Sequence, residues 1–406
     1  MRRAILTMTI TAILAMTASK ATGSDTVKAW SQAILARQPE TTLVATYHAL
    51  EARVRRAGDT PLDDASLTLL HENGQTLGRE GTMNFELGLR LPLKRLRQKT
   101  VYYRLADSFA RMGRVQQQWL AWQSRGIARR LLDTVEEKLL IARNDRNRLE
   151  QAQRLFAIVE EEVRAGAGSR LDLALARQRL GEAQARAADS AAALLAARRR
   201  LETWGIDLSD EQLALLLEEK PEPADVSGLD AIIDRHPEIL HLRARLALAE
   251  AQAEQAEWEA KPDRELYLGL RRERADHVSD DTLLVAEITL PLGKPSEQKL
   301  ARAEALLSRR ESTARLAAAE RDLRQSLIMA QARLAQARAQ LAPARRQRAA
   351  AEEALRLSRA AWHQGDISLR DLLLAQQALL DASLNAAMAE LAVNKAIRNL
   401  NQQAGE

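Results

Sequence analysis

The sequence contains no cysteine, few aromatic residues and no long apolar run. Among 406 residues there is no Cys, and Phe, Tyr and Trp together account for 3%. The absence of Cys excludes disulfides, thiolate catalysis, Cys-ligated zinc and lipid attachment through an N-terminal Cys. No stretch approaches the roughly 20 consecutive apolar residues that a membrane-spanning helix requires. The composition instead favours Ala, Leu, Arg, Glu and Gln, which is typical of long helices and coiled coils.

The N-terminus has the pattern of an export signal. Arg2 and Arg3 precede an apolar run over 4–18, and small residues follow, with a predicted cleavage site just before Ser24. We therefore assign residues 1–23 to a signal peptide. Its removal takes away three basic residues and lowers the formal net charge from +5 to +2. A chain this close to neutrality is a poor electrostatic match for a polyphosphate, so we expect no nucleic-acid partner.

The remainder of the chain is an internal duplication. Leu91-Pro92-Leu93 matches Leu290-Pro291-Leu292 at an offset of 199 residues, and the segment 33–40 matches 231–238 at an offset of 198. The segment 169–180 matches 368–379, again at 199. A nearly constant offset at three distant places indicates a tandem repeat. We assign the first repeat to 24–217 and the second to 229–406, joined by an acidic, proline-containing linker over 218–228.

Long stretches with little or no proline predict long helices in both repeats. No proline lies between Pro92 and Pro221, which predicts a helix over about 97–164, on the order of 100 Å long. In the second repeat we expect Pro343 to kink the corresponding helix or to mark an irregularity in it. Breaks at about 165–170 and 364–369 predict helical tips where the chain reverses. The return helices repeat apolar residues in steps of three and four with many Ala, which indicates closely packed coiled coils.

Each repeat also contains two segments in which apolar and polar residues strictly alternate. We predict β-hairpins over about 64–93 and 264–292, with the Leu residues of each strand on one face. Each segment has about nine to twelve residues, close to the length of a tilted membrane-crossing strand. Four strands cannot close a barrel, and lipid does not tolerate open sheet edges, so several chains must combine their hairpins. Two chains would provide eight strands and three would provide twelve.

Together these features resemble the outer-membrane efflux-channel family typified by TolC. The order of elements is similar: an export signal, then two repeats of helix, strand hairpin, long helix, reversal and return helix, with Leu-Pro-Leu after each second strand. The segments 166–173 and 365–372 look like the tip motif of that family. The resemblance covers essentially the whole mature chain. Leu-Pro-Leu and the helix starts Gln38-Pro39-Glu40 and His236-Pro237-Glu238 are similar to the heavy-metal-efflux branch.

The resemblance implies a fold, a location and partners. It implies a mainly α fold with a small transmembrane β part, in which a homotrimer forms a twelve-stranded β-barrel in the outer membrane and a twelve-helix periplasmic tunnel. The implied function is the outer-membrane channel of a tripartite efflux or type I secretion system. Its partners would be a periplasmic adaptor (membrane fusion) protein, an inner-membrane efflux pump and outer-membrane lipid. Such a channel is a passive conduit and not an enzyme, and it uses no cofactor or metal.

The candidate functional residues lie at the tips and in the strands. Asp172 and Asp371 follow the reversals by one turn, where they either line a periplasmic constriction that attracts cations or cap the return helices. The family often has a second Asp three residues further along one tip, where this chain has Leu175 and Leu374, so we expect a weaker or differently placed constriction. If the Leu rows face lipid, Arg90 faces the barrel lumen, and Glu287 does as well. The predicted adaptor-contact residues at the tips are Gly166, Gly168, Ser169, Gln364, Gly365 and Ser368.

The main alternative is a soluble periplasmic coiled-coil protein with a structural or adaptor-like role. It accounts for the helices but leaves the strands of membrane-crossing length unexplained. A nucleic-acid-binding coiled coil is supported only by the sequence pI of about 9.6. An enzyme has the least support, because the sequence shows no Ser/His/Asp arrangement, phosphate-binding Gly loop or metal-ligand spacing.

Overall fold

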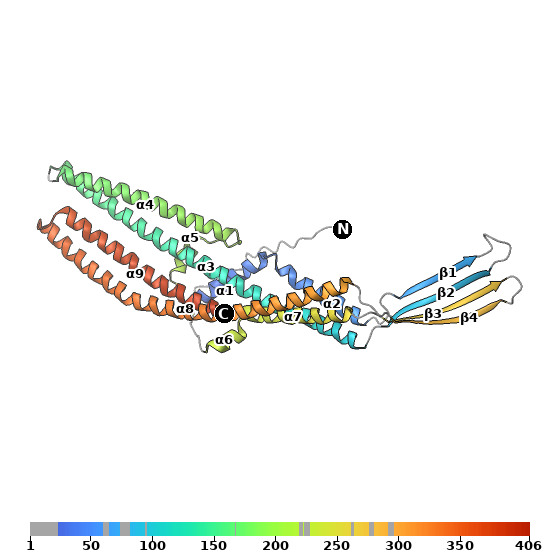
Figure 1. Ribbon diagram of the computed structural model, residues 1–406. Coiled ribbons are helices and arrows are strands. Elements are labelled where there is room, and N and C mark those ends of the chain that lie inside the picture. Colours follow the sequence, from blue (N-terminus) through green and yellow to red (C-terminus); the bar gives the residue numbers. More distant parts are fainter. Residues whose placement is uncertain are drawn as a thin grey trace. The chain divides into compact units, whose positions relative to one another are not determined.

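The computed structural model describes residues 23–59, 65–73, 82–93, 96–166, 168–218, 222, 228–260, 264–275, 280–290 and 296–406. The signal peptide and its cleavage site lie almost entirely outside the described residues, as does most of the predicted linker. The helices in the described part are α1 Gly23–Arg37, α2 Thr41–Asp59, α3 Leu96–Arg164, α4 Arg170–Glu202, α5 Asp210–Leu216, α6 Leu229–Arg235, α7 Pro237–Glu259, α8 Ser296–Gln364 and α9 Leu369–Gln403 (Figure 1). The strands are β1 Ser66–Asn73, β2 Thr82–Leu93, β3 Arg264–Ala275 and β4 Asp281–Thr289.

The fold is mainly helical with one small antiparallel sheet, as predicted. The order helix, hairpin, long helix and return helix occurs twice, as α2-β1-β2-α3-α4 and as α7-β3-β4-α8-α9. The two long helices, α3 and α8, have 69 residues each, so each is on the order of 100 Å long. Helix α8 continues through Pro343. Among the helices of the described residues, none combines the length and apolar character needed to cross a membrane.

The four strands form one sheet in the order β1-β2-β3-β4, with every neighbouring pair antiparallel. The register places leucines of all four strands side by side. Leu69 of β1 pairs with Leu87 of β2, which pairs with Leu270 of β3, and Leu270 pairs with Leu284 of β4. Leu91-Pro92-Leu93 forms the last residues of β2, within the predicted hairpin over about 64–93. The β1–β2 ladder ends at Arg90, so the missing N–H of Pro92 costs no hydrogen bond on that side.

The contacts within the chain define two compact units, and neither corresponds to one sequence repeat. The first unit contains 1–39, 120–236 and 322–406, and the second contains 40–119 and 237–321. Both repeats therefore contribute to each unit, and the long helices α3 and α8 each take part in both.

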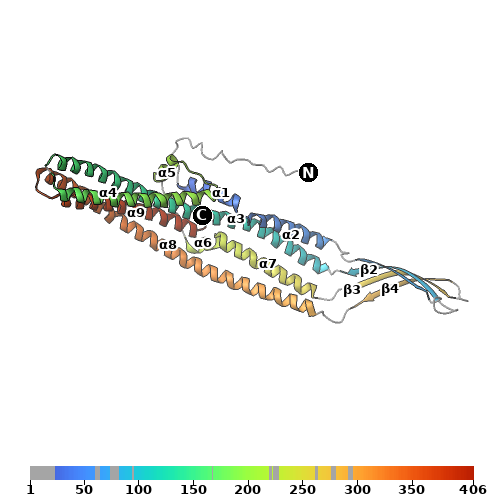
Figure 2. The same cartoon turned by 90° about the horizontal axis from the view of Figure 1, so that it is seen from above.

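The first unit has its largest core where α1 packs on the middle of α3, the end of α4 and the segment around α5. Trp30 and Ile34 of α1 are buried there beside Leu132 and Leu201. Ser209 caps helix α5, and its side chain accepts a hydrogen bond from the amide of Gln212 in a capping box. In the same unit α4 returns along the second part of α3, and α9 returns along α8 (Figure 2).

The second unit contains the sheet and a helical layer of α2, the first part of α3, α7 and the first part of α8. Its helical core joins Leu105, Phe109 and Met112 of α3 to Ala244 and Leu248 of α7. Helix α7 begins at Pro237, where a proline costs no helical hydrogen bond because the first amides of a helix have no partner within it.

Candidate functional site

The first tip joins α3 to α4 through two glycines. Gly166 adopts φ +78°, a left-handed conformation that favours glycine. The amide of Gly168 donates to the carbonyl of Glu162, and a Cβ added at Gly168 would lie 2.8 Å from Val163 Cγ2. Ser169 then caps α4, its Oγ accepting a hydrogen bond from the amide of Leu171. The sequence of this tip is thus sufficient to reverse the chain.

The second tip has the same design with a different cap. Gly365 adopts φ +82°, and Ser368 caps α9. The Ser368 side chain accepts from the amide of Asp371, and the Asp371 carboxylate accepts from the backbone N–H of Ser368 at 3.2 Å and from its hydroxyl at 2.6 Å. These hydrogen bonds, the one from the Ser368 side chain first, hold the pKa of Asp371 below its usual value. Asp371 therefore caps its own helix, whereas at the first tip Ser169 bonds Leu171 rather than Asp172.

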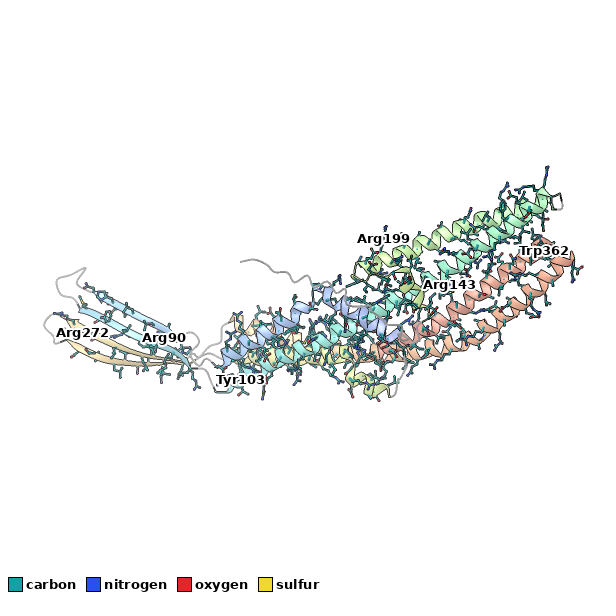
Figure 3. All side chains as sticks on the ribbon, turned by 180° about the vertical axis from the view of Figure 1, so that it is seen from behind. Arg90, Tyr103, Arg143, Arg199, Arg272 and Trp362 are labelled. Atoms are coloured by element: carbon teal, nitrogen blue, oxygen red, sulfur yellow. The ribbon has the colours of Figure 1, made fainter. Side chains whose placement is uncertain are left out.

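An apolar cluster brings the two tips together within the first unit. Leu155, Val159 and Ala176 of the α3–α4 hairpin are buried against Leu369 and Leu372 of α9. Trp362, near the end of α8, packs against the edge of this cluster (Figure 3). Two leucines are left outward: Leu171 is 67% exposed and Leu374 is 52% exposed. Each tip thus combines a glycine turn with a leucine that the chain itself does not cover.

One face of the sheet carries charged and polar side chains. Arg90 on β2, Tyr267 on β3 and Glu287 on β4 are paired across the sheet in one row, so all three lie on the same face. The Arg90 side chain bonds Glu265 at 3.1 Å and lies over the Tyr267 ring, 5.5 Å from its centroid. Glu287 is exposed and accepts a hydrogen bond from the Thr289 hydroxyl. The predicted lumen residues therefore share a face.

Tyr267 organises the polar face through a closely packed contact. Its hydroxyl donates to Glu86, and Arg271 donates to the other oxygen of the same carboxylate at 2.7 Å. The ring lies over Gly88 and Gly269, and a Cβ added at Gly88 would lie 2.1 Å from the Tyr267 hydroxyl oxygen. The two glycines therefore make room for the ring. We did not single out Glu86, Tyr267 or Arg271 from the sequence: alternation puts them on the polar face, but only the register brings them together.

The opposite face of the sheet is apolar and exposed. Leu67 on one edge strand is 72% exposed and Leu284 on the other is 77% exposed. The same face exposes Leu69, Phe85, Leu87, Leu89, Leu268, Leu270 and Ile288. A soluble monomer rarely exposes a continuous apolar surface of this extent, which indicates contact with lipid or with another apolar surface.

The first unit also contains a buried cluster of charges that sequence analysis missed. Arg129 of α3 forms an ion pair with Glu222 at 2.9 Å and donates to the backbone carbonyl of Glu406. On α9, Arg398 bonds Asp133 at 2.7 Å and also pairs with Glu136. These partners lie far apart along the chain, so no local pattern reveals them. Their arrangement fixes α9 against α3.

The histidines and carboxylates of the described residues do not form a metal centre. No group of three or more His, Asp or Glu side chains is arranged there to hold a metal ion. His241 instead stacks on Trp119, with ring centroids 4.6 Å apart, and its Nε2 is 2.9 Å from Gln116 Oε1.

Comparison with known proteins gives a consistent result. Residues 228–406 match the family described as "Outer membrane efflux protein". No curated protein matches the chain. Among solved structures, a membrane protein from Pseudomonas aeruginosa has a TM-score of 0.70 at 17% identity and covers 93% of each chain. The CmeC outer membrane channel of Campylobacter jejuni has a TM-score of 0.70 at 14% identity, covering 94% of this chain and 86% of its own.

A third structure extends the same conclusion. The outer membrane protein VceC of Vibrio cholerae has a TM-score of 0.69 at 12% identity, with 93% of this chain and 96% of VceC covered. The matched family and the matched folds are those of outer-membrane efflux proteins and outer-membrane channels, in agreement with the predicted location and role. The second repeat matches the outer membrane efflux protein family, and nearly the whole chain has the fold of outer-membrane channels. The predicted resemblance to the TolC-like efflux-channel family is thereby confirmed.

Proposed function

We propose that this protein is the outer-membrane channel of a tripartite efflux or type I secretion system, a passive trimeric conduit from the periplasm to the exterior. The sheet carries the main support for this proposal. It has exposed Leu rows on one face and the ion pairs of Arg90 and Arg271 on the other. An outward apolar face and a polar inner face are what a transmembrane β-barrel requires.

The two edges of the sheet support assembly from several copies. Strand β1 pairs only with β2, and β4 pairs only with β3, among the strands of the described residues. In lipid, each peptide group on those edges needs a partner. Pairing β1 of one copy with β4 of the next satisfies both edges, and three copies form a closed barrel of twelve strands. The helices α3, α4, α8 and α9 of three copies would supply the twelve-helix tunnel.

Disulfide cross-linking tests this assembly directly, because the native chain has no Cys. Thr68→Cys on β1 is combined in turn with Leu283→Cys, Val285→Cys or Glu287→Cys on β4, all on the polar face. At least one pair should give, after oxidation in membranes, a covalent species of three times the chain mass. Each single-Cys variant is the matched control and should not form that species. Failure of every pair, together with recovery of the mature chain in the soluble periplasmic fraction, would support the alternative of a soluble coiled-coil protein.

The tip aspartates give a test of ion selectivity. In a trimer, Asp172 and Asp371 provide six carboxylates at the periplasmic end, which would attract cations. Asp172→Asn should lower cation selectivity in planar bilayers without disturbing a helix cap, whereas Asp371→Asn also weakens the capping box. Asp366→Asn, at the same tip but before α9, is the control for charge alone. If the double variant Asp172→Asn with Asp371→Asn keeps the ion selectivity of the wild type, both aspartates act only at the N-termini of their helices.

Docking to a periplasmic adaptor is assigned to the tips, at Gly166, Gly168, Ser169, Gln364, Gly365 and Ser368. The exposed Leu171 and Leu374 support this assignment, because a protein partner would bury them. Gly365 has no atom within 4 Å of an added Cβ, so only its positive φ restricts substitution. Gly365→Asn tolerates that backbone better than Gly365→Val. If export is lost in both variants while trimers form, docking requires a bare glycine; normal export in both would contradict docking at this tip.

A further inference from the structure

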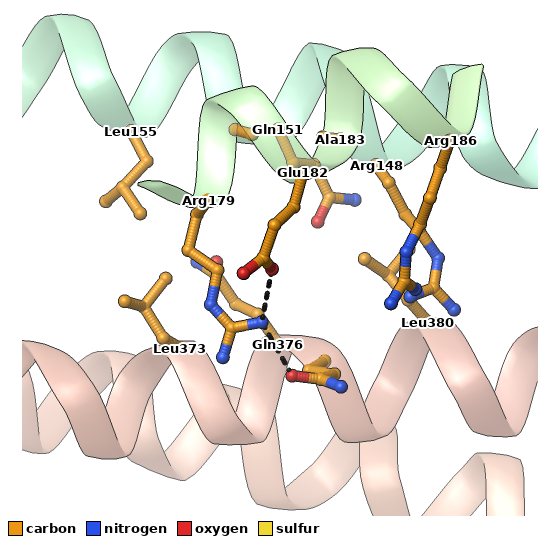
Figure 4. Close-up of a pocket in the computed structure, with 12 residues that line it drawn as sticks. Arg148, Gln151, Leu155, Arg179, Glu182, Ala183, Arg186, Leu373, Gln376 and Leu380 are labelled. Carbon is orange, nitrogen blue, oxygen red and sulfur yellow. Dashed lines mark hydrogen bonds and ion pairs between the residues drawn. The ribbon is translucent and has the colours of Figure 1, made fainter. Parts of the chain in front are cut away.

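A solvent-accessible cavity in the first unit lies between the α3–α4 hairpin and α9, and its walls are rich in arginine and glutamine. Its volume is about 80 Å³. Arg148 and Gln151 of α3, Arg179 and Arg186 of α4, and Gln376 of α9 line it together with a few apolar side chains (Figure 4). Since a water molecule occupies about 30 Å³ of liquid, the space suits a few waters or one small polyatomic ion.

The side chains that line the cavity carry more positive than negative charge. Three of its lining residues are arginines, and Glu182 is its single lining carboxylate. Arg179 donates to Gln377 Oε1 at 2.9 Å and lies 3.7 Å from the Glu182 carboxylate. Arg148 forms an ion pair with Asp381, which lies outside the lining. Arg148 also forms an ion pair with Asp145 at 3.8 Å, so Arg186 is the lining arginine that has no ion pair within the described part of the chain.

Two of the arginines converge without a common acceptor. The guanidinium groups of Arg148 and Arg186 lie side by side at one end of the cavity (Figure 4). The Nε of Arg148 is buried and makes no hydrogen bond to any described residue, although it forms an ion pair with Asp145 at 3.8 Å. Arg186 forms neither an ion pair nor a hydrogen bond within the described part of the chain. Two like charges placed together with unused donors form a site that attracts an anion.

We propose that this cavity binds a small oxyanion of the phosphate class, held between Arg148 and Arg186. Arginine forks bind two oxygens of such an ion at once and bind it more strongly than neutral donors do. The amide groups of Gln151 and Gln376 supply further N–H donors around the cavity. Because donors come from α3, α4 and α9, the bound ion links the first helical hairpin to the return helix of the second. This site stands independently of the proposed channel function.

Isothermal titration of the full-length protein in detergent with inorganic phosphate, in chloride-poor buffer, tests the site. Arg186→Gln removes the exposed partner without opening the core, and it should weaken phosphate binding about 10- to 100-fold, the loss expected for a hydrogen bond to a charged group. Arg186→Lys keeps the charge but loses the two-pronged guanidinium, so its affinity for phosphate should lie between those of the wild type and of Arg186→Gln. Arg177→Gln is the matched control, because Arg177 is also exposed on α4 but does not line the cavity.

Thermal unfolding provides a second readout. Phosphate stabilises many proteins without binding them specifically, so the comparison between variants decides the result. Added phosphate should raise the unfolding temperature of the wild type and of Arg177→Gln more than that of Arg186→Gln. Absence of binding heat with the wild type, or equal affinity in Arg186→Gln and Arg177→Gln, would overturn the proposal.

Discussion

Replacement of Arg398 by methionine should strongly destabilise the first unit. The Arg398 side chain is 4% exposed on α9. Its Nε donates to Asp133 at 2.7 Å, and its two terminal nitrogens donate to Glu136. Methionine fills similar space but leaves the buried Glu136 and the partly buried Asp133 without their arginine.

The size of the effect follows from burial. Removing one partner of a buried ion pair costs about 3–5 kcal/mol, because the other charge stays in a medium that solvates it poorly. The matched control is Arg345→Met, which removes an exposed pair with Glu390 between α8 and α9. An exposed pair contributes about 0–1 kcal/mol. The two variants remove the same type of side chain from the same hairpin and differ mainly in burial.

The pH dependence distinguishes lost charge pairing from lost packing. Burial raises the pKa of Asp133 and of Glu136, and Arg398 opposes that rise. Without Arg398 both pKa values rise further. A carboxyl whose folded pKa exceeds its unfolded value contributes stability that is present at low pH and is lost as pH rises through the folded pKa. The deficit of Arg398→Met relative to the wild type should therefore be largest at neutral pH and smaller in acid.

Urea unfolding in detergent, followed by far-UV circular dichroism at two pH values, measures both effects. A second variant, with Glu136→Gln added to Arg398→Met, should recover part of the loss at neutral pH because one buried charge is removed. Our reasoning is refuted if Arg398→Met is no more destabilising than Arg345→Met, or if its deficit does not change with pH.

Three further predictions concern histidine and glycine positions. Burial lowers the pKa of His236 from 6.5 to about 4. The stability of the fold should therefore fall as pH drops from 6.5 towards 4, because only the unfolded imidazole gains a proton in that range. In thermal unfolding, the His236→Asn variant should lose less stability than the wild type over the same pH range. Gly88→Ala should displace the Tyr267 ring from Glu86 and lower the yield of detergent-extracted oligomer, and Tyr267→Ala in the same chain should restore it. Gly205→Ala should destabilise the first unit, because Gly205 has φ +67° and an added Cβ would lie 1.7 Å from Arg37 Nη2. In contrast, Gly181 has no atom within 4 Å of an added Cβ, so Gly181→Ala should stabilise α4 by about 0.5–1 kcal/mol.

Local patterns allowed much of the architecture to be predicted. The proline-free stretch after Pro92 predicted α3, observed at Leu96–Arg164, and the glycines at 166 and 365 predicted the reversals. Strict alternation predicted four strands with Leu on one face. Each of these features depends on residues close together in the chain, where backbone preference and side-chain periodicity act directly.

The roles of the tip aspartates needed the structure. Asp172 and Asp371 occupy equivalent places in the two repeats, and the sequence left capping and constriction open for both. The Ser368 side chain accepts a hydrogen bond from the amide of Asp371, whereas the Ser169 side chain accepts one from the amide of Leu171. Equivalent sequence positions therefore have different hydrogen bonds.

The sequence by itself determined the periodicity of the strands, the long helices, the duplicated order of elements and the resemblance to outer-membrane efflux channels. Tertiary structure alone decided which strands meet in which register, so that Glu86, Tyr267 and Arg271 form one cluster. It also decided that Arg398 meets Asp133, 265 residues away, and that Arg148 and Arg186 line one cavity. The physical reason is that backbone preference acts over a few residues, whereas these contacts arise only when whole helices and strands pack together.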